Sequence, residues 1–427
     1  MHAVTEKPQR PRIFVWLLGA VLLFLVVARS SLMPESIAFI TPVIVAVALI
    51  LALVSFGGGL RIPLSMLGVL ALTIILVVST GAREGTSDTV KALGIGLMWS
   101  SALLCGMAMD ANVRRFLVRF LLVVATIETG VAVLETLVGL EAIRGSVAGT
   151  TSDVYIVRAN TILGDWTNRA QGTLGYPIPL AHFLSIAWIL TAVSDAIRGR
   201  WRWVLLVWLT LGILLTGTRT ALVAVAVGLV VAVLVRSRRR VIPVVIVIVA
   251  AFGGAGFLAN YLAQADESND ASFTHRFGVI QAAQQLFGRD IAYVLFGSGV
   301  NSQGSLFGGV IFQDGVTGAI DNTYLTMFIC AGLLGFVIFI GFFVTAFVAA
   351  SAPTRAVLAV FGVFFFSYDA VWWHLIATLF WLTIGMAFAE RQDRRLKILL
   401  GTHPKRARTG LQPCRQALAA SPQSNNH

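Results

Sequence analysis

Four arginines of this chain lie where a guanidinium could bind an anion: Arg169, Arg219, Arg276 and Arg289. Arg219 is the clearest, because it stands in the stretch TGTRTA between two long apolar runs. A guanidinium is always charged, and its flat fork of N–H donors fits two phosphate oxygens at once. Thr218 is a suitable N-cap for the second apolar run, and the N–H groups at a helix start also bind phosphate. The pattern predicts a phosphate site at this helix start.

Each of these arginines also has a purely structural interpretation. Arg219 could anchor a short interhelical turn by extending its charge to the membrane interface. Arg276 could be a solvated surface charge, and Arg169 and Arg289 could be loop charges. A cation at a helix start opposes the helix dipole, however, so Arg219 without a bound anion is unfavourably placed.

Asp321, Asn322 and Tyr324 lie at the start of another apolar run, DNTYLTMFICAGLLGF. Aspartate and asparagine are good helix caps, and capping alone could explain both of them. A carboxylate at this position could instead act as a general base toward a sugar hydroxyl. Tyr324, within the first turn, could bond with a sugar or stack on it.

Two histidines are further candidates for the base, and two glutamates lie inside an apolar run. His275 neighbours Arg276, and His182 lies early in another apolar run, although a lone histidine is more often structural. Glu128 and Glu135, seven residues apart, share one helix face. Glu128 is deep enough to need a partner or a water-filled cavity. No spacing indicates a metal site or a nucleotide cofactor, so we expect no cofactor.

The elements that must position these residues are membrane helices. Of the 427 residues, 57% are hydrophobic and 12% are charged, and the mean hydropathy is +0.85. A soluble domain carries about 25% charged residues, so we predict an all-α polytopic membrane protein. The first run resembles a signal sequence without a cleavage site, and we expect it to be retained. About twelve transmembrane helices are expected, at 13–29, 37–56, 63–80, 90–109, 116–139, 177–196, 203–216, 220–235, 241–258, 323–349, 355–368 and 371–388.

Short basic clusters alternate between these runs and predict the topology. They account for much of the net charge of +12, and they set orientation in a membrane rather than indicate a nucleic-acid partner. We expect a transmembrane domain over 1–390 in the cytoplasmic (inner) membrane, with both termini cytoplasmic, and a basic, disordered tail over 391–427. Two long loops, 143–176 and 259–322, then lie outside, in the periplasm. The second carries an amphipathic pattern typical of a short surface helix.

Four motifs in this order resemble the O-antigen ligase/O-antigen polymerase superfamily of bacterial envelope glycosyltransferases. They run over about 165–340 and read NRAQGTLGYPIPLAHFLS, TGTRTALVAVAVG, HRFGVIQAAQQLF…LFGSGVNS and DNTYLTMFICAGLLGF. The resemblance implies a donor glycan on an undecaprenyl-type pyrophosphate, a glycan or lipid acceptor, and transfer at the outer leaflet without metal or nucleotide sugar. It also implies that Arg219 and Arg276 bind the pyrophosphate, and Arg169 is a further candidate.

One position departs from the family pattern. Ligases of this family carry a histidine near the start of the helix that opens with DNTYL, where this chain has Asp321. A polymerase, or a ligase for another acceptor, is therefore expected, with Asp321 or His275 as catalytic base and Asn322 and Tyr324 on the glycan. The alternative is a multi-pass secondary transporter, which Glu128 would suit. Transporters often contain internal repeats and broken helices, however, and the sequence has no convincing repeat.

Overall fold

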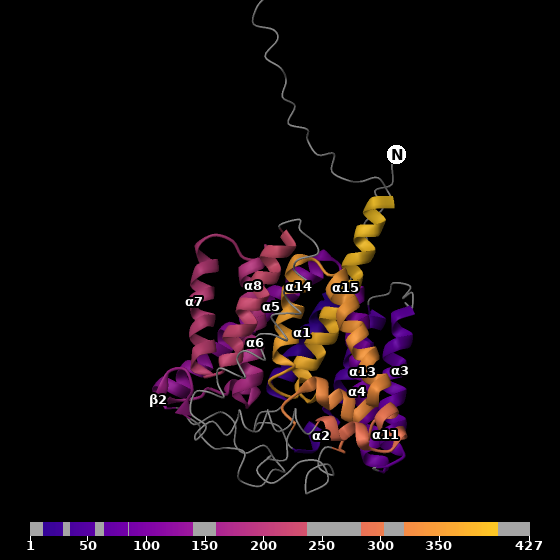
Figure 1. Cartoon of the computed structure of the whole chain (residues 1–427). Coiled ribbons are helices and arrows are strands. Elements are labelled where there is room, and N and C mark those ends of the chain that lie inside the picture. Colours follow the sequence, from indigo (N-terminus) through magenta and orange to yellow (C-terminus); the bar gives the residue numbers. More distant parts are fainter. Residues whose placement is uncertain are drawn as a thin grey trace, which may run out of the picture. The chain divides into compact units, whose positions relative to one another are not determined.

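A computed structural model of the chain is mostly helical, and it describes residues 12–28, 35–55, 64–83, 85–139, 159–236, 283–302 and 320–399 (Figure 1). The helices are α1 (Arg12–Val27), α2 (Glu35–Ser55), α3 (Leu64–Gly81), α4 (Thr86–Ala108), α5 (Ala111–Val133), α6 (Pro177–Val193), α7 (Arg200–Leu215), α8 (Arg219–Arg236), α11 (Ile291–Phe296), α13 (Thr323–Ala349), α14 (Ala352–Phe364) and α15 (His374–Leu399). Short helical turns are η1 (Leu134–Val138), η3 (Gly172–Leu174), η4 (Ala283–Gly288) and η5 (Ala370–Trp372). Two short strands, β1 (Ala159–Asn160) and β2 (Gly164–Asn168), form an antiparallel hairpin.

The predicted helices are present wherever the structure describes their residues, most of them with shifted ends, while α13 has the predicted bounds. α5 begins at Ala111, five residues before the predicted start, because the Asp110 side chain accepts hydrogen bonds from Asn112 N and Val113 N, both at 2.9 Å. An N-cap of this kind satisfies amides that have no partner inside the helix. The ninth predicted run, 241–258, and most of the predicted surface helix lie outside the described residues. The hairpin is a small exception to the all-α prediction.

Four helices of the described residues are long and apolar enough to cross a membrane: α4, α5 with η1, α8 and α13. Shorter apolar helices lie at Ile13–Val27, Ile40–Ser55, Met66–Gly81, Pro177–Val193 and Ala352–Phe364. The number of twelve crossings therefore stays a prediction. Contacts divide the chain into two units, Met1–Glu390 and Arg391–His427, and in the second the residues up to Leu399 are helical.

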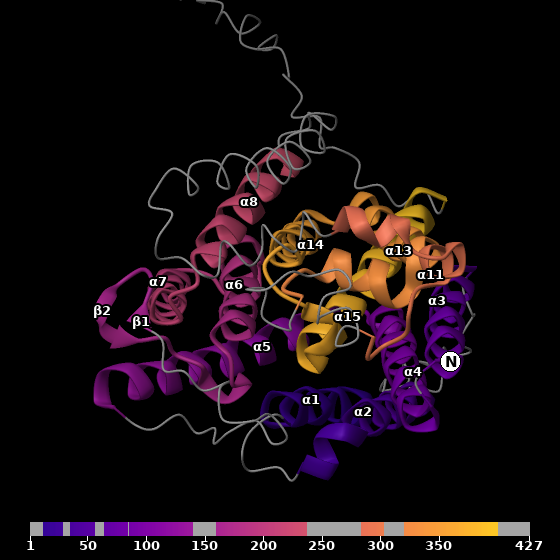
Figure 2. The ribbon, with the colours of Figure 1, turned by 60° about the horizontal axis from the view of Figure 1, so that its bottom comes forward.

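Within the first unit, the helices form two neighbouring groups (Figure 2). One contains α1 to α4 with α13, and α4 packs on both α2 and α3. The other contains α5 to α8 with α14, which packs on both α6 and α8. Aromatic side chains join α13, α14 and α15, where Phe380 contacts Phe339, Phe361, Phe365 and Trp381 with ring centroids 5.0 to 5.5 Å apart. Rings at such distances stabilise a core beyond the area they bury.

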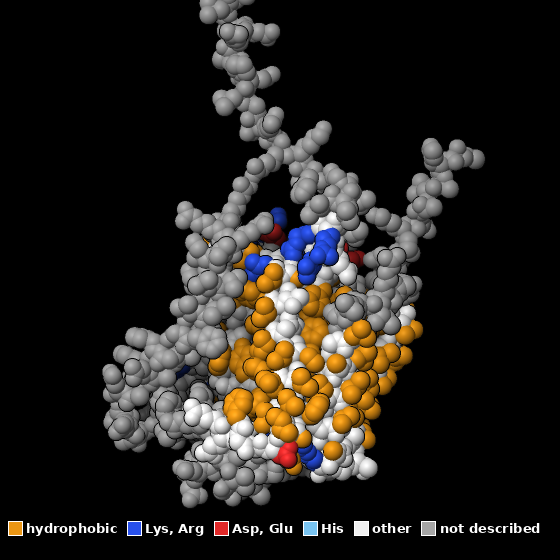
Figure 3. Space-filling view, turned by 45° about the vertical axis from the view of Figure 1, so that its right-hand side comes forward, with side chains coloured by type: hydrophobic (Ala, Val, Ile, Leu, Met, Phe, Trp, Pro, Cys, Tyr) orange, Lys and Arg blue, Asp and Glu red, His pale blue; other side chains and the backbone are white. Residues whose placement is uncertain are grey.

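The surface of this unit carries a wide apolar band (Figure 3). Large hydrophobic side chains are exposed along several helices, among them Leu67, Ile74 and Val78 of α3 and Val337, Val344 and Val348 of α13. A soluble monomer rarely exposes so much contiguous apolar surface, whereas a helix that faces lipid does. Figure 3 also shows lysine and arginine side chains gathered beyond one end of the band. The protein is therefore suited to a membrane.

Interhelical junctions gather at the two ends of the helices. At one end, Arg236 at the end of α8 donates to Val193 O of α6 at 2.7 Å, and Arg114 of α5 pairs with Glu390 of α15 at 3.4 Å. At the other end, the turn between α7 and α8 meets the β1–β2 hairpin. α8 has 18 residues, so these ends are about 27 Å apart. Arg114 and Arg236 thus lie at the end of the helices opposite to the candidate site.

Candidate functional site

The turn between α7 and α8 carries the sequence TGTRTA and places Arg219 at the surface. Gly217 has a φ of +62°, a left-handed conformation that lets the chain reverse without the strain a side chain would add. α8 then begins at Arg219, directly after Thr218, as predicted. The Arg219 side chain is exposed, and its Nη2 donates to Thr161 O at 3.3 Å. A guanidinium therefore stands at the positive end of a helix dipole.

The hairpin holds this turn in place. Asn160 Nδ2 donates to Leu214 O at 2.9 Å and to Leu215 O at 3.0 Å, which are carbonyls left over at the end of α7. Thr161 Oγ1 donates to Gly217 O at 2.5 Å. Neither Asn160 nor Thr161 was among the predicted site residues, because their partners lie more than fifty residues away. The only local signal was a polar stretch beside Gly164, which is typical of a hairpin turn.

Arg169 contacts the same turn from the other side. Its Nε donates to Thr216 O at 2.9 Å and its Nη2 to Thr218 Oγ1 at 3.0 Å, while Ala170 N donates to Leu215 O at 2.9 Å. The Thr218 hydroxyl also donates to Thr216 O at 3.4 Å. The structure thus brings the predicted residues Arg169 and Arg219 to one turn. Arg169 stabilises that turn through its hydrogen bonds and also adds a positive charge to it.

Replacing Gly217 with alanine is expected to destabilise this turn. A Cβ there would lie 2.9 Å from Asn160 Oδ1 and 3.0 Å from Arg169 Cγ, in addition to the positive φ. Together these should lower the free energy of unfolding by about 1–3 kcal/mol. Thermal unfolding of the purified protein in detergent measures the effect. Gly130→Ala in α5, where a Cβ meets nothing within 4 Å, is the control, and equal midpoints for the two variants would contradict the prediction.

Two glutamates of α5 and η1 hold the segment that leads into α6. The buried Glu128 accepts from Thr173 N at 2.9 Å and also from the Thr173 hydroxyl. Glu135 Oε2 accepts from Gln171 N and Gly172 N, both at 2.9 Å. The prediction that Glu128 needs a partner is confirmed. A carboxylate that binds two donors of a neighbouring segment fixes that segment, so Glu128 has a structural role here.

Replacing Glu128 with glutamine is expected to loosen this junction. One carboxylate oxygen becomes an NH₂ group, so a Thr173 donor loses its acceptor inside the apolar helices, at a cost of about 1–3 kcal/mol. The midpoint of thermal unfolding in detergent should fall. Asp195→Asn serves as control, because Asp195 is 84% exposed and pairs only loosely with Arg198, at 3.8 Å. The prediction fails if both variants unfold at the wild-type temperature.

The start of α13 is bonded to the connection between α14 and α15. Asn322 Oδ1 accepts from Leu325 N at 3.1 Å, so Asn322 is the N-cap. Thr323 N donates to Phe365 O at 2.8 Å, and its hydroxyl donates to Tyr368 O at 2.9 Å. Asp321 is half-buried beside this cap. The residues directly after Asp321 are thus held by hydrogen bonds, which is compatible with the prediction that its carboxylate acts as a base.

Tyr324 and His182 are both packed among aromatic rings near this corner. The Tyr324 hydroxyl donates to Gly362 O at 3.1 Å. The fully buried His182 ring stacks on Phe364 with centroids 4.2 Å apart, and its Nδ1 bonds with Tyr368 Oη at 2.7 Å. These internal partners explain both residues structurally. For His182 they favour the structural interpretation over a role as base.

A second pair of arginines, Arg83 and Arg289, lies between α3 and α11, and Arg83 was not among the predicted residues. Arg83 Nη1 donates to Gly297 O at 2.5 Å, and its Cζ lies 3.5 Å from the centre of the Tyr293 ring. Arg289 Nη1 donates to Ser298 Oγ at 2.8 Å. Burial, and then the charge of Arg83, lowers the pKa of Arg289. These bonds fix the loop before Val300, so the pair has a structural explanation.

The contacts above place the predicted site residues in two groups. Arg169 and Arg219 meet at the α7–α8 turn, and Asp321, Asn322 and Tyr324 lie at the start of α13. The predicted His275 and Arg276 lie outside the described residues. The elements that carry the two groups are linked through α14, which packs on α6 and α8 and also contacts α13. Among the described residues, no three histidine, cysteine or acidic side chains are placed to hold a metal.

Residues 204–340 match the family model described as O-antigen ligase. This segment of the chain is therefore similar to the O-antigen ligase family. The resemblance to the O-antigen ligase/polymerase superfamily is thereby confirmed. No curated protein is matched to the chain. The family and the apolar helices together indicate an O-antigen ligase- or polymerase-like function in a membrane, with lipid-linked glycan as the class of substrate.

The matched segment covers most of the candidate site. It runs from α7 through α8 and α13, and it contains Arg219, the Asn322 cap and Tyr324. Arg169 and the hairpin lie before it. The segment therefore receives part of its support from residues that precede the match, because Arg169 and Asn160 bond directly with its first interhelical turn.

Proposed function

We propose that the chain transfers or polymerises a polyprenyl-pyrophosphate-linked glycan at the outer leaflet of the cytoplasmic membrane. The observation that carries the proposal is the convergence of Arg169 and Arg219 on the turn between α7 and α8, within or beside the O-antigen ligase segment. Two guanidiniums at a helix start favour a doubly charged phosphate group, through charge and through the N–H groups of the helix. The proposal requires neither a metal nor a nucleotide cofactor.

The reaction follows from this arrangement. The donor's pyrophosphate binds at Arg219, with Arg276 as a further ligand and Arg169 holding the turn. The oxygen of an acceptor hydroxyl forms a bond to the anomeric carbon while the bond from that carbon to the phosphate oxygen breaks. The fixed positive charge stabilises the departing polyprenyl pyrophosphate. The hydroxyl proton passes to Asp321, or to His275 as the alternative base, and Asn322 and Tyr324 contact the glycan.

The proposed orientation places this chemistry at the outer side of the cytoplasmic membrane. Arg114 and Arg236 lie at the end of the helices opposite to the α7–α8 turn. Basic residues of short loops remain on the cytoplasmic side, so that end is assigned to the cytoplasm, together with both termini. The 1–390 unit is then the membrane domain, with loops 143–176 and 259–322 outside, and 391–427 is a cytoplasmic tail.

Proteoliposomes that contain the purified chain and a lipid-linked glycan test this function. Polymer indicates a polymerase, glycan on an added acceptor indicates a ligase, and a single displacement gives a product anomer opposite to the donor. Retention of the anomeric configuration would exclude the single displacement. A chain that moves the glycan across the bilayer without forming a glycosidic bond would be the transporter alternative, and the proposal would then be wrong.

A further inference from the structure

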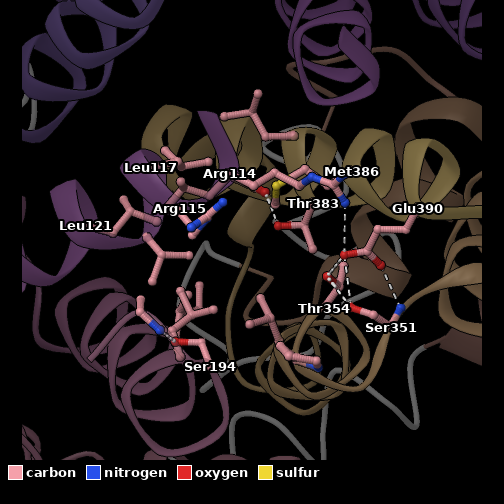
Figure 4. Close-up of a pocket in the computed structure, with 18 of the residues that line it drawn as sticks. Arg114, Arg115, Leu117, Leu121, Ser194, Ser351, Thr354, Thr383, Met386 and Glu390 are labelled. Atoms are coloured by element: carbon pink, nitrogen blue, oxygen red, sulfur yellow. Dashed lines mark hydrogen bonds and ion pairs between the residues drawn. The ribbon is translucent and has the colours of Figure 1, made fainter. Parts of the chain in front are cut away.

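A groove lies between α5, α6, α14 and α15, at the end of the helices away from the α7–α8 turn (Figure 4). Its volume is about 180 Å³. Its walls are mainly apolar and include side chains from all four helices: Leu121, Ile186, Leu190, Val357 and Leu382. An apolar space of this kind holds water poorly, so it is suited to a hydrocarbon chain.

Charged and polar groups stand at the mouth of this groove. Glu390 of α15 accepts from Ser351 N at 2.6 Å, from Ser351 Oγ at 2.9 Å and from Thr354 Oγ1 at 2.8 Å. Arg114 Nη1 lies 3.4 Å from the same carboxylate. One side of the mouth is therefore a closed network that joins α5, α14 and α15, as the dashed lines in Figure 4 show.

Arg115 supplies the charge on the other side. Its side chain lines the groove and is exposed, and its Nη2 donates to Asn112 Oδ1 at 2.9 Å. Glu390 is opposed by Arg114, and the exposed Asp195 at the groove lies within 3.8 Å of Arg198. Arg114, Arg115 and the nearby Arg198 outnumber the acids Glu390 and Asp195 by one, which gives the mouth a net positive character.

We propose that this groove binds an anionic glycerophospholipid of the surrounding membrane. One acyl chain lies among the apolar walls, and the phosphate lies at Arg115. The apolar lining recognises hydrocarbon in general, whereas Arg115 selects for a headgroup with net negative charge. The lipid would bridge α5 and α6 to α14 and α15. The proposal is independent of glycan transfer, because the groove and the α7–α8 turn lie at opposite ends of the helices.

Lipid binding by the full chain tests this site. Protein purified in detergent is titrated with phosphatidylglycerol or with phosphatidylcholine, and bound lipid is counted by native mass spectrometry. Wild-type protein should bind phosphatidylglycerol more tightly. The Arg115→Gln variant should lose about fivefold in affinity for phosphatidylglycerol and little for phosphatidylcholine, since one surface cation contributes about that factor. Arg200→Gln, an exposed arginine outside the groove, should bind as wild type.

A second variant tests the hydrocarbon part of the site. Val118 lines the groove and is half-buried. Val118→Trp should fill the space and weaken the binding of both lipids. Equal affinity of the wild-type protein for the two lipids, or equal phosphatidylglycerol binding by Arg115→Gln and Arg200→Gln, would overturn the proposal. The arginine variants change only exposed side chains, so they decide the question even if Val118→Trp does not fold.

Discussion

Arg219→Ala is expected to lower the rate of glycan transfer in proteoliposomes by about 10²–10³-fold. Arg219 stands at the first residue of α8, where its charge and the helix N–H groups act on the same anion. The pyrophosphate gains charge as the bond to the sugar breaks, so a fixed cation is worth more in the transition state than with the bound donor. Donor binding should weaken as well.

Two further variants are compared with Arg219→Ala in order to interpret its rate of transfer. Arg219→Lys keeps the charge but not the flat fork of donors, so an intermediate rate is expected. Arg200→Ala removes an exposed arginine from the start of α7, at the other end of that helix, and should leave the rate unchanged. The side chain of Arg219 is exposed, so its removal opens no cavity, and unfolding should begin at the wild-type temperature. Transfer by Arg219→Ala at the wild-type rate would show that the phosphate site lies elsewhere.

The Asp321→Asn variant is expected to lose about 10²–10⁴-fold in rate, which is the usual contribution of a general base. Asparagine keeps the size and most of the hydrogen bonding of aspartate but cannot accept the proton. Binding of the donor should stay near the wild-type value, since Asp321 acts on the acceptor. Initial rates at saturating donor, together with a separate measurement of donor binding, distinguish this loss from that of Arg219→Ala.

The alternative base requires its own comparison. His275→Gln removes the histidine beside Arg276 in the same way. If His275→Gln loses the rate while Asp321→Asn keeps it within about tenfold, the histidine is the base and the assignment of Asp321 is wrong. The ratio between the two variants is informative because the two residues lie on different segments, one before α13 and one within 237–282.

The family and the elements could largely be predicted from local sequence. Apolar runs form helices because each run satisfies its own backbone and turns an apolar surface to lipid. The order of the motifs around Arg219 and Asp321 indicated the superfamily that the O-antigen ligase segment at 204–340 confirms. Some helix ends were predicted less well, because a cap such as Asp110 decides where α5 begins, whereas both ends of α13 and its Asn322 cap agree with the prediction.

The arrangement of the candidate site could not be predicted in this way. Nothing near Arg169 in the sequence indicates that its partners are Thr216 and Thr218, and nothing near Asn160 indicates Leu214. These bonds depend on how α7 and α8 are brought beside the hairpin. The same holds for Glu128, whose need for a partner followed from its burial in an apolar run, although the identity of that partner, Thr173, did not.

The sequence by itself thus determined that the helices are suited to a membrane, where those helices lie and which family the chain resembles. Hydropathy and short motifs are properties of contiguous residues, so they can be read without the tertiary structure. Only the tertiary structure decided which polar groups meet. Inside apolar helices each such group must find a partner, and the partner is whichever donor or acceptor packing brings within reach. The approach of Arg169 to the turn of Arg219, and the groove beside Arg115, are consequences of that packing.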